Sequence, residues 1–355
     1  MFRTISFLYC FFAVFLLLTD TAVFADTVSG KNTSENTGEN ASDIRKATDT
    51  AVPRLVRIET VGGHEKVGSE FANEGTAAGI LLDKDGFVIT SAFNFIHDPS
   101  SILIRFSDNT KKVAEVIATD RNRMLTLLKT EPPAPSSPLA AAITPPLNYR
   151  SKDSLKNGEL CIVLGTALSL SEPNITVGIV SGKDRIWGKA VQTDAAIGPD
   201  NYGGAIIDKD GRFIAVAVPL SMTSNDIAAG ADLYDAGVGM GIPFEDIFQI
   251  VLPRMMNLKG NKNLEPAYFG FNFKDNKVFI GEAVLDGVAA GSPAEKAGLK
   301  IGDKITAVNG QEIHSCIELT MFTRKCYAGE KIQFKYLRNG NETQTELETA
   351  VPPKK

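Results

Sequence analysis

Short apolar runs, rich in valine, isoleucine and leucine, recur along residues 51–252 of the 355-residue chain. Glycines, prolines and polar residues separate the runs, which include residues 55–58, 78–82, 87–90 and 102–106. Strand-length runs broken at this spacing are typical of an all-β barrel or sandwich. Asp85-Gly86 and Asp210-Gly211 each lie between two runs. Both pairs therefore predict hairpin turns, and their similar settings suggest two related halves.

The pattern changes after a charged, glycine-containing segment at residues 257–265 (NLKGNKNLE). Beyond it, residues 318–324 have helical spacing, with Leu319, Phe322 and Cys326 on one face. Strand-like runs surround this predicted helix at residues 277–279, 304–308 and 332–337. The sequence therefore predicts a second, smaller domain that contains both strands and helix.

The N-terminus begins with Arg3, continues as an apolar stretch at residues 5–18 and reaches a small-residue cleavage pattern at residues 23–25. This order predicts a secretory signal peptide over residues 1–25, hence export to the periplasm or outside the cell. The apolar stretch is shorter than the ~20 residues that cross a bilayer, so an uncleaved anchor is the second interpretation. We expect no membrane span after cleavage. Residues 26–48 are polar and lack aromatics, which predicts a flexible linker.

The composition is that of globular protein, with 43% hydrophobic and 22% charged residues, and the length suggests two or three domains. The net charge of -5 gives no indication of nucleic-acid binding. Outside the signal peptide only Cys161, Cys316 and Cys326 remain, an odd number that argues against a disulfide framework and predicts three buried thiols. Cysteines, histidines and acidic residues lack metal-ligand spacing, so we expect neither a metal site nor a cofactor.

Residues 75–90 (GTAAGILLDKDGFVIT) resemble the first barrel of HtrA/Deg-type, trypsin-like serine proteases. Three further blocks resemble the same family in the same order. They are LGTA at 164–167 followed by TVGIVS at 176–181, QTDAAIGPDNYGGA at 192–205, and GVGMGIP at 237–243. The resemblance implies a mainly β fold, a chymotrypsin/trypsin-like double β-barrel over residues 49–255.

The resemblance also implies a position for each member of the Ser-His-Asp triad of this family. The family's histidine follows three residues after the threonine that ends a strand, here Thr90, and that position is Phe93. The acid position corresponds to Met124. The nucleophile position, before the Gly-Gly pair, is Tyr202. The glycine two residues earlier, whose N–H helps to form the oxyanion hole, is replaced by Asp200.

None of these replacements can perform the original role. Phenylalanine accepts no proton, methionine cannot orient an imidazolium, and a phenol with a pKa near ~10 is a poor nucleophile without a base. A carboxylate at Asp200 would also repel a developing oxyanion. A triad relocated elsewhere is the alternative, but the histidines are only His64, His97 and His314. We expect Phe93, Met124 and Tyr202 to meet as an aromatic–sulfur cluster that fills the site.

Residues 291–303 (GSPAEKAGLKIGD) and 308–310 (VNG) resemble the PDZ domains of HtrA/Deg proteins. This implies a PDZ domain with two short helices over residues 265–350, after a linker at 256–264. PDZ domains bind a peptide as an added strand. By resemblance, the predicted peptide-binding residues are Tyr268, Phe269, Gly270 and Phe271 in the carboxylate loop, and Leu319, Phe322 and Thr323 on the facing helix. An apolar C-terminal side chain is the favoured ligand, although Phe271 and Phe273 could equally be core residues.

The leading hypothesis is an exported pseudoprotease that binds C-terminal or unfolded peptide segments as a scaffold, regulator or chaperone, without hydrolysis. The first alternative is an active serine-type endopeptidase of periplasmic protein quality control with a non-standard site. The second is a holdase-type chaperone that acts through the barrel. By resemblance, the partners include a homo-trimer formed through residues 43–56 or an assembly with active HtrA-like proteases.

Overall fold

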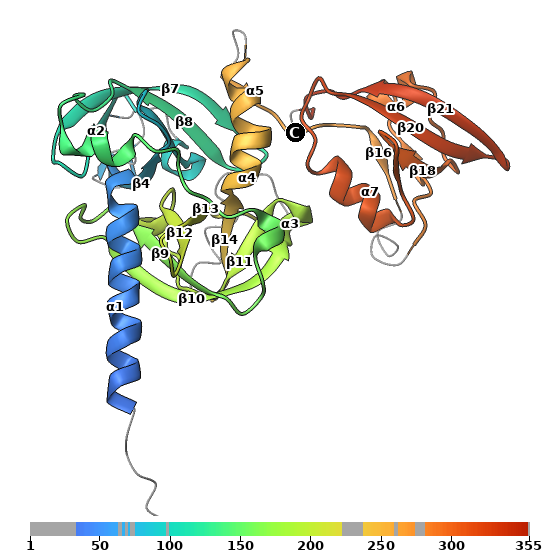
Figure 1. The fold of residues 1–355 in the computed structure, drawn as a ribbon. Coiled ribbons are helices and arrows are strands. Elements are labelled where there is room, and N and C mark those ends of the chain that lie inside the picture. The colour runs from blue at the N-terminus through green and yellow to red at the C-terminus, as the bar shows by residue number, and fades with distance from the viewer. Residues whose placement is uncertain are drawn as a thin grey trace, which may run out of the picture. The chain divides into compact units, whose positions relative to one another are not determined.

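The computed structural model describes residues 33–62, 66–67, 70–71, 75–96, 99–221, 237–258, 262–273 and 281–353. Within the chain, residues Ala41–Lys355 form one compact unit. It contains two β-barrels and a smaller C-terminal domain (Figure 1). The predicted signal peptide, the strand-like run at 277–279, His64 and His97 lie outside the described residues.

The helix α1 (Thr33–Ala51) corrects the prediction of a flexible linker over residues 33–48, the described part of the predicted range 26–48. Ala47 and Ala51 are buried in the core, and Ile44 packs against them. These three residues follow helical spacing, so they share one face. Packing of that narrow face against the barrels supplies the stability that the polar composition of the segment does not suggest.

The first barrel closes in the strand order β7-β6-β1-β4-β5-β8, because β8 also pairs with β7. Its strands are β1 (Leu55–Val61), β4 (Gly75–Leu81), β5 (Phe87–Ser91), β6 (Ser101–Arg105), β7 (Lys111–Asp120) and β8 (Leu125–Thr130). The four predicted apolar runs are therefore confirmed as strands. The predicted Asp85-Gly86 turn joins β4 to β5. Gly86 has φ +88°, and an added Cβ would lie 2.3 Å from the Thr130 carbonyl, so the turn requires glycine.

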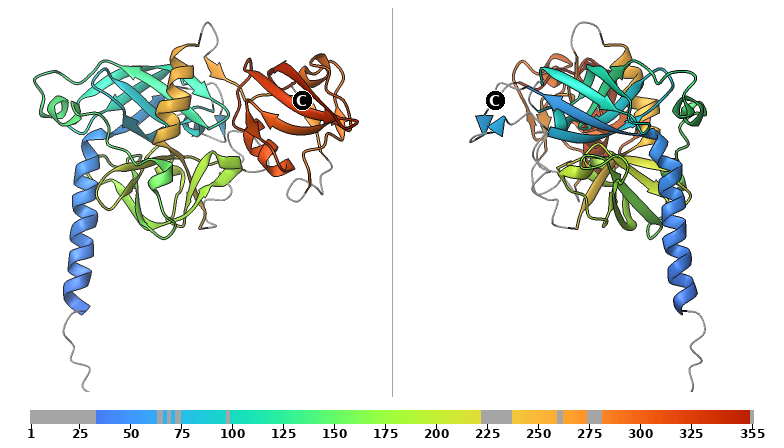
Figure 2. Two further views of the ribbon diagram at one scale, coloured as in Figure 1. Left: turned by 45° about the vertical axis from the view of Figure 1, so that its right-hand side comes forward. Right: turned by 90° about the vertical axis from the view of Figure 1, so that its left-hand side faces the viewer.

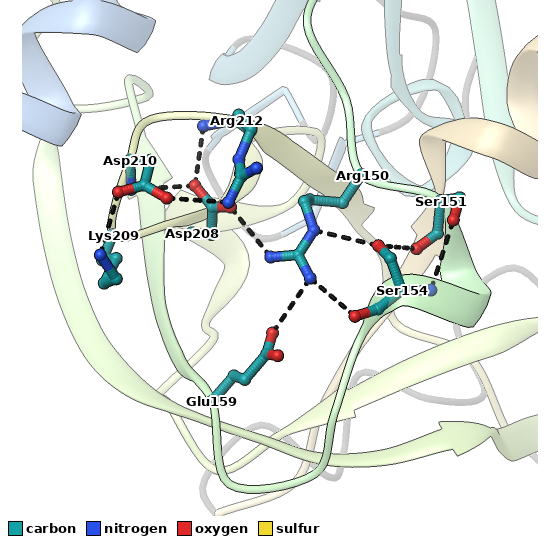
Figure 3. Close-up of polar contacts among 8 residues, drawn as sticks. All are labelled: Arg150, Ser151, Ser154, Glu159, Asp208, Lys209, Asp210 and Arg212. Carbon is teal, nitrogen blue, oxygen red and sulfur yellow. Dashed lines mark hydrogen bonds and ion pairs between the residues drawn. The ribbon is translucent and has the colours of Figure 1, made fainter.

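The second barrel, yellow-green in Figures 1 and 2, closes in the order β10-β11-β14-β13-β12-β9. Its strands are β9 (Leu160–Gly165), β10 (Asn174–Asp184), β11 (Ala190–Thr193), β12 (Ala205–Asp208), β13 (Phe213–Ala217) and β14 (Gly239–Pro243). The predicted Asp210-Gly211 turn joins β12 to β13. Figure 3 shows how this hairpin is held: Asp208 accepts from Arg150 at 3.1 Å and from Arg212 at 2.8 Å. Both barrels therefore use the expected hairpins.

Short elements connect these sheets. They are η1 (Val52–Arg54), β2 (Lys66–Val67), β3 (Glu70–Phe71), η2 (Ala92–Phe95), α2 (Pro138–Ile143), η3 (Lys152–Ser154), α3 (Arg185–Gly188), η4 (Pro199–Asn201), α4 (Phe244–Asp246), η6 (Ile247–Val251), α5 (Leu252–Met256) and β15 (Asn263–Leu264). β15 pairs in parallel with β7, so the predicted linker at 256–264 ends as a strand of the first sheet.

The C-terminal domain combines two small sheets with two short helices. Its elements are β16 (Phe271–Asn272), β17 (Gly287–Val288), α6 (Pro293–Lys296), β18 (Lys304–Val308), β19 (Gln311–Glu312), α7 (Cys316–Thr323), β20 (Lys331–Arg338) and β21 (Asn341–Glu348). The predicted helix at 318–324 and the strands at 304–308 and 332–337 are confirmed as α7, β18 and β20. Cys161, Cys316 and Cys326 are buried, as expected, and none of these described cysteines forms a disulfide.

Candidate functional site

Two of the three positions assigned to a triad, Phe93 and Tyr202, are in contact where the two barrels meet, and Met124 lies in a neighbouring core cluster. Phe93 lies in η2 directly after β5, Met124 in the turn between β7 and β8, and Tyr202 directly after η4. The Phe93 and Tyr202 rings pack edge to face, with centroids 5.2 Å apart and planes at 73°. The Ala92 N–H donates to the Met124 carbonyl at 2.8 Å, and Phe93 packs against the core cluster that contains Met124. Met124 and Tyr202 are buried.

The loop that carries Tyr202 is fixed to the first barrel by an amide that sequence reasoning missed. Asn94 Nδ2 donates to the Tyr202 carbonyl at 3.1 Å and to Thr90 Oγ1 at 3.2 Å. The Thr90 hydroxyl in turn donates to the Ala78 carbonyl at 2.7 Å. At Gly203, φ is +86° and an added Cβ would lie 2.2 Å from Thr90 Oγ1, so the close approach of the loop requires glycine.

The backbone around Asp200 forms a tight 3₁₀ turn rather than an open anion cradle. The Tyr202 N–H donates to the Pro199 carbonyl at 3.2 Å, and the Asn201 N–H donates to Gly198 at 2.9 Å. The Asp200 side chain is exposed. An oxyanion hole requires N–H donors aimed at the developing charge. Here the Tyr202 N–H is already paired within the loop.

Among the described residues, neither His314 nor Cys161 supplies a base or a second nucleophile next to Phe93 and Tyr202. His314 is exposed on the C-terminal domain, 3.5 Å from Glu312. Cys161 is fully buried, with Sγ 3.0 Å from Thr193 Oγ1. Burial raises the pKa of the Cys161 thiol to about 11, so the reactive thiolate is scarce near neutral pH.

A buried polar cluster immediately precedes Met124 and was not foreseen from the sequence. Asp120 and Arg123 are both fully buried. The Tyr327 hydroxyl donates to Asp120 Oδ2 at 2.5 Å and accepts from Arg123 Nη1 at 2.5 Å. Burial raises the pKa of Asp120 and, together with the Asp120 charge, raises that of Tyr327. Since Tyr327 belongs to the C-terminal domain, this cluster joins that domain to the first barrel.

The predicted carboxylate loop has backbone donors to which no partner is assigned among the described residues. Gly270 has φ +84°, and an added Cβ would lie 2.1 Å from Ser292 Cβ. The Phe269 and Gly270 carbonyls accept from Ala294 at 2.9 Å and Ala289 at 2.7 Å, which fixes the loop. Across the described part of the chain, no hydrogen bond is assigned to the N–H of Phe269 or Gly270. Such donors can hold a carboxylate.

The side chains of the predicted peptide groove divide into two groups. Leu319 is 0% and Phe269 6% exposed, so both side chains belong to the core beneath the predicted groove and do not face a ligand. Phe271, Phe322 and Thr323 are half-buried, as are Phe273 and the loop residue Tyr268. Phe271 and Phe273 pack against the core and still keep exposed surface, with ring centroids 5.9 Å apart.

Both domains match known families. A trypsin-like peptidase domain matches residues 77–216, and a PDZ domain matches residues 267–349. In both domains the chain is similar to proteins of the HtrA/DegP type. The predicted trypsin-like double barrel followed by a PDZ domain is therefore confirmed.

Named relatives of the HtrA/DegP type align with most of this chain. It is 28% identical over 341 residues to a probable periplasmic serine endoprotease DegP-like of Hahella chejuensis, covering 88% of this chain and 67% of the relative. It is 26% identical over 344 residues to the serine protease Do-like HtrA of Bacillus subtilis, covering 86% and 72%. A DegP-like relative of Chlamydia pneumoniae is 30% identical over 303 residues, covering 82% and 57%. The chain thus spans roughly half to three quarters of these relatives.

Solved structures show the same fold. HtrA-type protease AlgW with a tripeptide has a TM-score of 0.64 and 21% identity, covering 88% of this chain and 98% of that chain. The serine endoprotease from Yersinia pestis has a TM-score of 0.61 and 20% identity, covering 87% and 98%. Within the described residues, no helix combines the length and apolarity needed to cross a bilayer.

Proposed function

We propose that this HtrA/DegP-type chain is a pseudoprotease that binds C-terminal or unfolded peptide segments through its PDZ domain and does not hydrolyse them. The observation that carries the proposal is the packing of Phe93 on Tyr202, with ring centroids 5.2 Å apart, at the positions assigned to base and nucleophile. An edge-to-face aromatic pair fills space and stabilises the core. It offers no proton acceptor to activate a hydroxyl.

The size of the expected loss in turnover supports the proposal that the chain is inactive as a protease. Removing one central triad member typically lowers turnover by about 10⁶, and the residual rate depends on the oxyanion hole and on binding. Here base, acid and nucleophile positions are all changed. The Tyr202 N–H that would serve the oxyanion hole donates to Pro199 instead. The residual mechanism is therefore weakened together with the triad.

Peptide binding by the PDZ domain is supported by the N–H groups of Phe269 and Gly270, which have no partner within the described ranges, and by the half-buried Phe271 and Phe322 in the same domain. A C-terminal carboxylate would accept from the N–H groups, while the peptide backbone adds to strand β16. The partly exposed rings would favour an apolar last side chain. Leu319 supports this surface from within the core.

Export to the periplasm is the localisation that we propose. Two observations support it: the apolar N-terminal stretch at residues 5–18, and relatives that are named periplasmic. A homo-trimer, or an assembly with active HtrA-like proteases, is the proposed arrangement. In either assembly the chain would contribute a peptide-reading PDZ domain without a cutting site.

Hydrolysis is tested by incubating the purified full chain with unfolded casein and, separately, with a fluorophosphonate probe. We expect neither casein fragments nor a labelled residue, whereas an active HtrA protease in parallel reactions should give both. Labelling at Tyr202, or at any serine, would refute the pseudoprotease proposal and favour the alternative of an active endopeptidase.

Peptide binding is tested by screening the full chain against peptides with a free C-terminal carboxylate and against the same peptides as C-terminal amides. Losing a charge-assisted carboxylate contact of about 2 kcal/mol should weaken the Kd about 30-fold. Gly270→Ala should abolish binding, because its Cβ would collide with Ser292. Gly298→Ala is the matched control: φ is +80° there too, but the space is open. Equal affinity for acid and amide peptides would contradict the assignment.

One observation favours the holdase as a second candidate. Alternate positions along β10 carry Ile175, Val177 and Ile179, whose exposed fractions are 39%, 44% and 39%. An exposed apolar stripe on a strand can hold unfolded chains. Replacing all three by serine should then abolish suppression of citrate synthase aggregation. Unchanged suppression by that variant would exclude the stripe.

A further inference from the structure

Lys189 lies at a junction of three parts of the chain. It directly follows α3 of the second barrel and is 2% exposed. Its Nζ donates to the Asn122 carbonyl at 2.9 Å and to Asn122 Oδ1 at 3.1 Å. Asn122 lies in the β7–β8 turn of the first barrel, and its Nδ2 donates to the Cys326 carbonyl of the PDZ domain at 3.2 Å. One asparagine therefore connects the amine to the PDZ domain.

The hydrogen bonds at this junction suit a neutral amine. A neutral lysine has two N–H groups, and the two Asn122 oxygens accept both. An ammonium group has three N–H donors. Within the described residues, no further acceptor is assigned to Lys189. A third proton would therefore leave a buried donor without a partner, which costs free energy beyond the cost of burying the charge.

The charges that face Lys189 disfavour the protonated form. Arg123 in the β7–β8 turn and Arg324 after α7 are cations that lower the pKa of Lys189, and Asp120 opposes them. The Lys325 side chain of the PDZ domain lies near Gly188, the residue before Lys189. Its Nζ would be 3.7 Å from a Cβ added to that glycine. Two cations and one carboxylate therefore act on the amine from the turn and from the PDZ domain.

Charged groups on the same element as Lys189 are directed elsewhere. Arg185 Nε donates to Gln192 Oε1 at 3.1 Å. Asp184 pairs with Lys152 at 2.8 Å, so its carboxylate does not compensate a charge on Lys189. The surroundings of the amine are thus set by the β7–β8 turn and by the end of α7.

We propose that Lys189 is a proton-sensitive latch that holds the PDZ domain to the barrels while its amine is neutral and weakens this contact when protonated. The latch does not depend on the proposed function, because it requires neither hydrolysis nor a peptide. It gives the chain a response to acidity at the domain boundary, beside α7, which carries residues of the proposed peptide groove.

The pKa of Lys189 agrees with this geometry. Burial, reinforced by the Arg123 charge, lowers it from 10.5 to about 7. When the PDZ domain separates and water reaches the amine, the pKa returns toward 10.5. Between pH 7 and 10.5 the separated state then binds more protons than the docked state. Docking therefore weakens as pH falls through this window and is constant below about pH 7, up to about 100-fold weaker at pH 6 than at pH 9.

The chain's single tryptophan, Trp187, can report on this contact. The Arg324 guanidinium, just after α7, lies 6.0 Å from the centre of the Trp187 ring. We would follow Trp187 fluorescence of the full chain during urea titration at pH 6, 7, 8 and 9, with far-UV circular dichroism as the measure of barrel unfolding. In the unmodified protein, the equilibrium constant of the fluorescence transition should rise up to about 100-fold from pH 9 to pH 6.

Variants of the amine decide between a latch and a general effect of pH. Lys189→Met is permanently uncharged and should remove the extra pH dependence, as should Lys189→Gln if methionine disturbs folding. Lys156→Met replaces an exposed lysine of the same barrel and should keep the full response. The latch is refuted if Lys189→Met and the unmodified chain respond equally to pH. It is also refuted if the fluorescence and dichroism transitions coincide at every pH, because Lys189 would then stabilise the whole fold.

Discussion

We expect the aromatic pair at the positions assigned to base and nucleophile to contribute measurably to stability. Tyr202 is 2% exposed, and burial of a tyrosine removes roughly 150–250 Å² from water. At about 25 cal/mol per Å² this corresponds to roughly 4–6 kcal/mol. Tyr202→Ser would lose most of it and leave a cavity against Phe93, so we expect the free energy of unfolding to fall by about 4 kcal/mol.

Urea unfolding followed by circular dichroism measures this change. With a slope of about 2 kcal/mol per molar urea, a loss of about 4 kcal/mol lowers the midpoint by about 2 M. The serine introduced by Tyr202→Ser should not react with a fluorophosphonate probe, because Phe93 supplies no base. The variant therefore separates the packing role of the ring from any chemical role of the position.

A double-mutant cycle isolates the contact itself. Phe93→Leu and Tyr202→Leu, alone and combined, should give a coupling energy of about 1 kcal/mol, the value typical of an edge-to-face pair. Tyr149, which stacks on Phe248 with centroids 5.3 Å apart, is the matched control. Tyr149→Leu should not couple to Phe93→Leu. A coupling energy near zero for Phe93 and Tyr202, or an unchanged midpoint for Tyr202→Ser, would refute the reasoning that the site is filled.

Two further outcomes follow from buried polar groups. Tyr327→Phe removes the donor to Asp120 and should lower the free energy of unfolding by about 2–3 kcal/mol, because a buried carboxylate loses a hydrogen bond. Tyr336→Phe is the control, because no hydrogen bond is assigned to that hydroxyl among the described residues. It should change the free energy of unfolding by less than about 0.5 kcal/mol in the same urea assay. Equal losses for Tyr327→Phe and Tyr336→Phe would contradict the role of Asp120. Burial raises the pKa of Cys161 to about 11 and that of Cys326 to about 12, so iodoacetamide at pH 8 should label neither until urea unfolds the chain. Mass spectrometry of the folded protein reads this out, and rapid labelling of Cys161 would contradict it.

Sequence alone was sufficient where local pattern determines structure. Strand-length apolar runs around Asp85-Gly86 and Asp210-Gly211 predicted hairpins because turn residues and apolar runs act within a few residues. The helix α1 was missed because its apolar residues on the core, among those from residue 41 onward, are Ile44, Ala47 and Ala51, too narrow a stripe to recognise in a polar segment. Its stability comes from packing against strands that are distant in the sequence.

The candidate site shows the same difference between features that a sequence motif predicts and features that depend on distant contacts. Phe93, Met124 and Tyr202 could be selected only because four ordered blocks fixed the register of the resemblance. The spacing of apolar residues alone would have assigned all three to the ordinary core. The Asp120–Tyr327 hydrogen bond could not be anticipated, since 207 residues separate its partners and neither lies in a motif. Contacts between distant segments depend on the assembled fold, which no local pattern encodes.

The pairing of β15 with β7 sets the effective concentration of the PDZ domain at the barrel surface. Asn263 and Leu264 pair with β7 of the first sheet. Two residues further on, Pro266 forms a β-bridge with Tyr327 of the PDZ domain. So short a tether keeps the two surfaces together even when the interface opens, so that docking is an intramolecular event in the millimolar range of effective concentration. A contact too weak to join separate molecules would therefore remain populated here, and small changes in its strength would alter its occupancy.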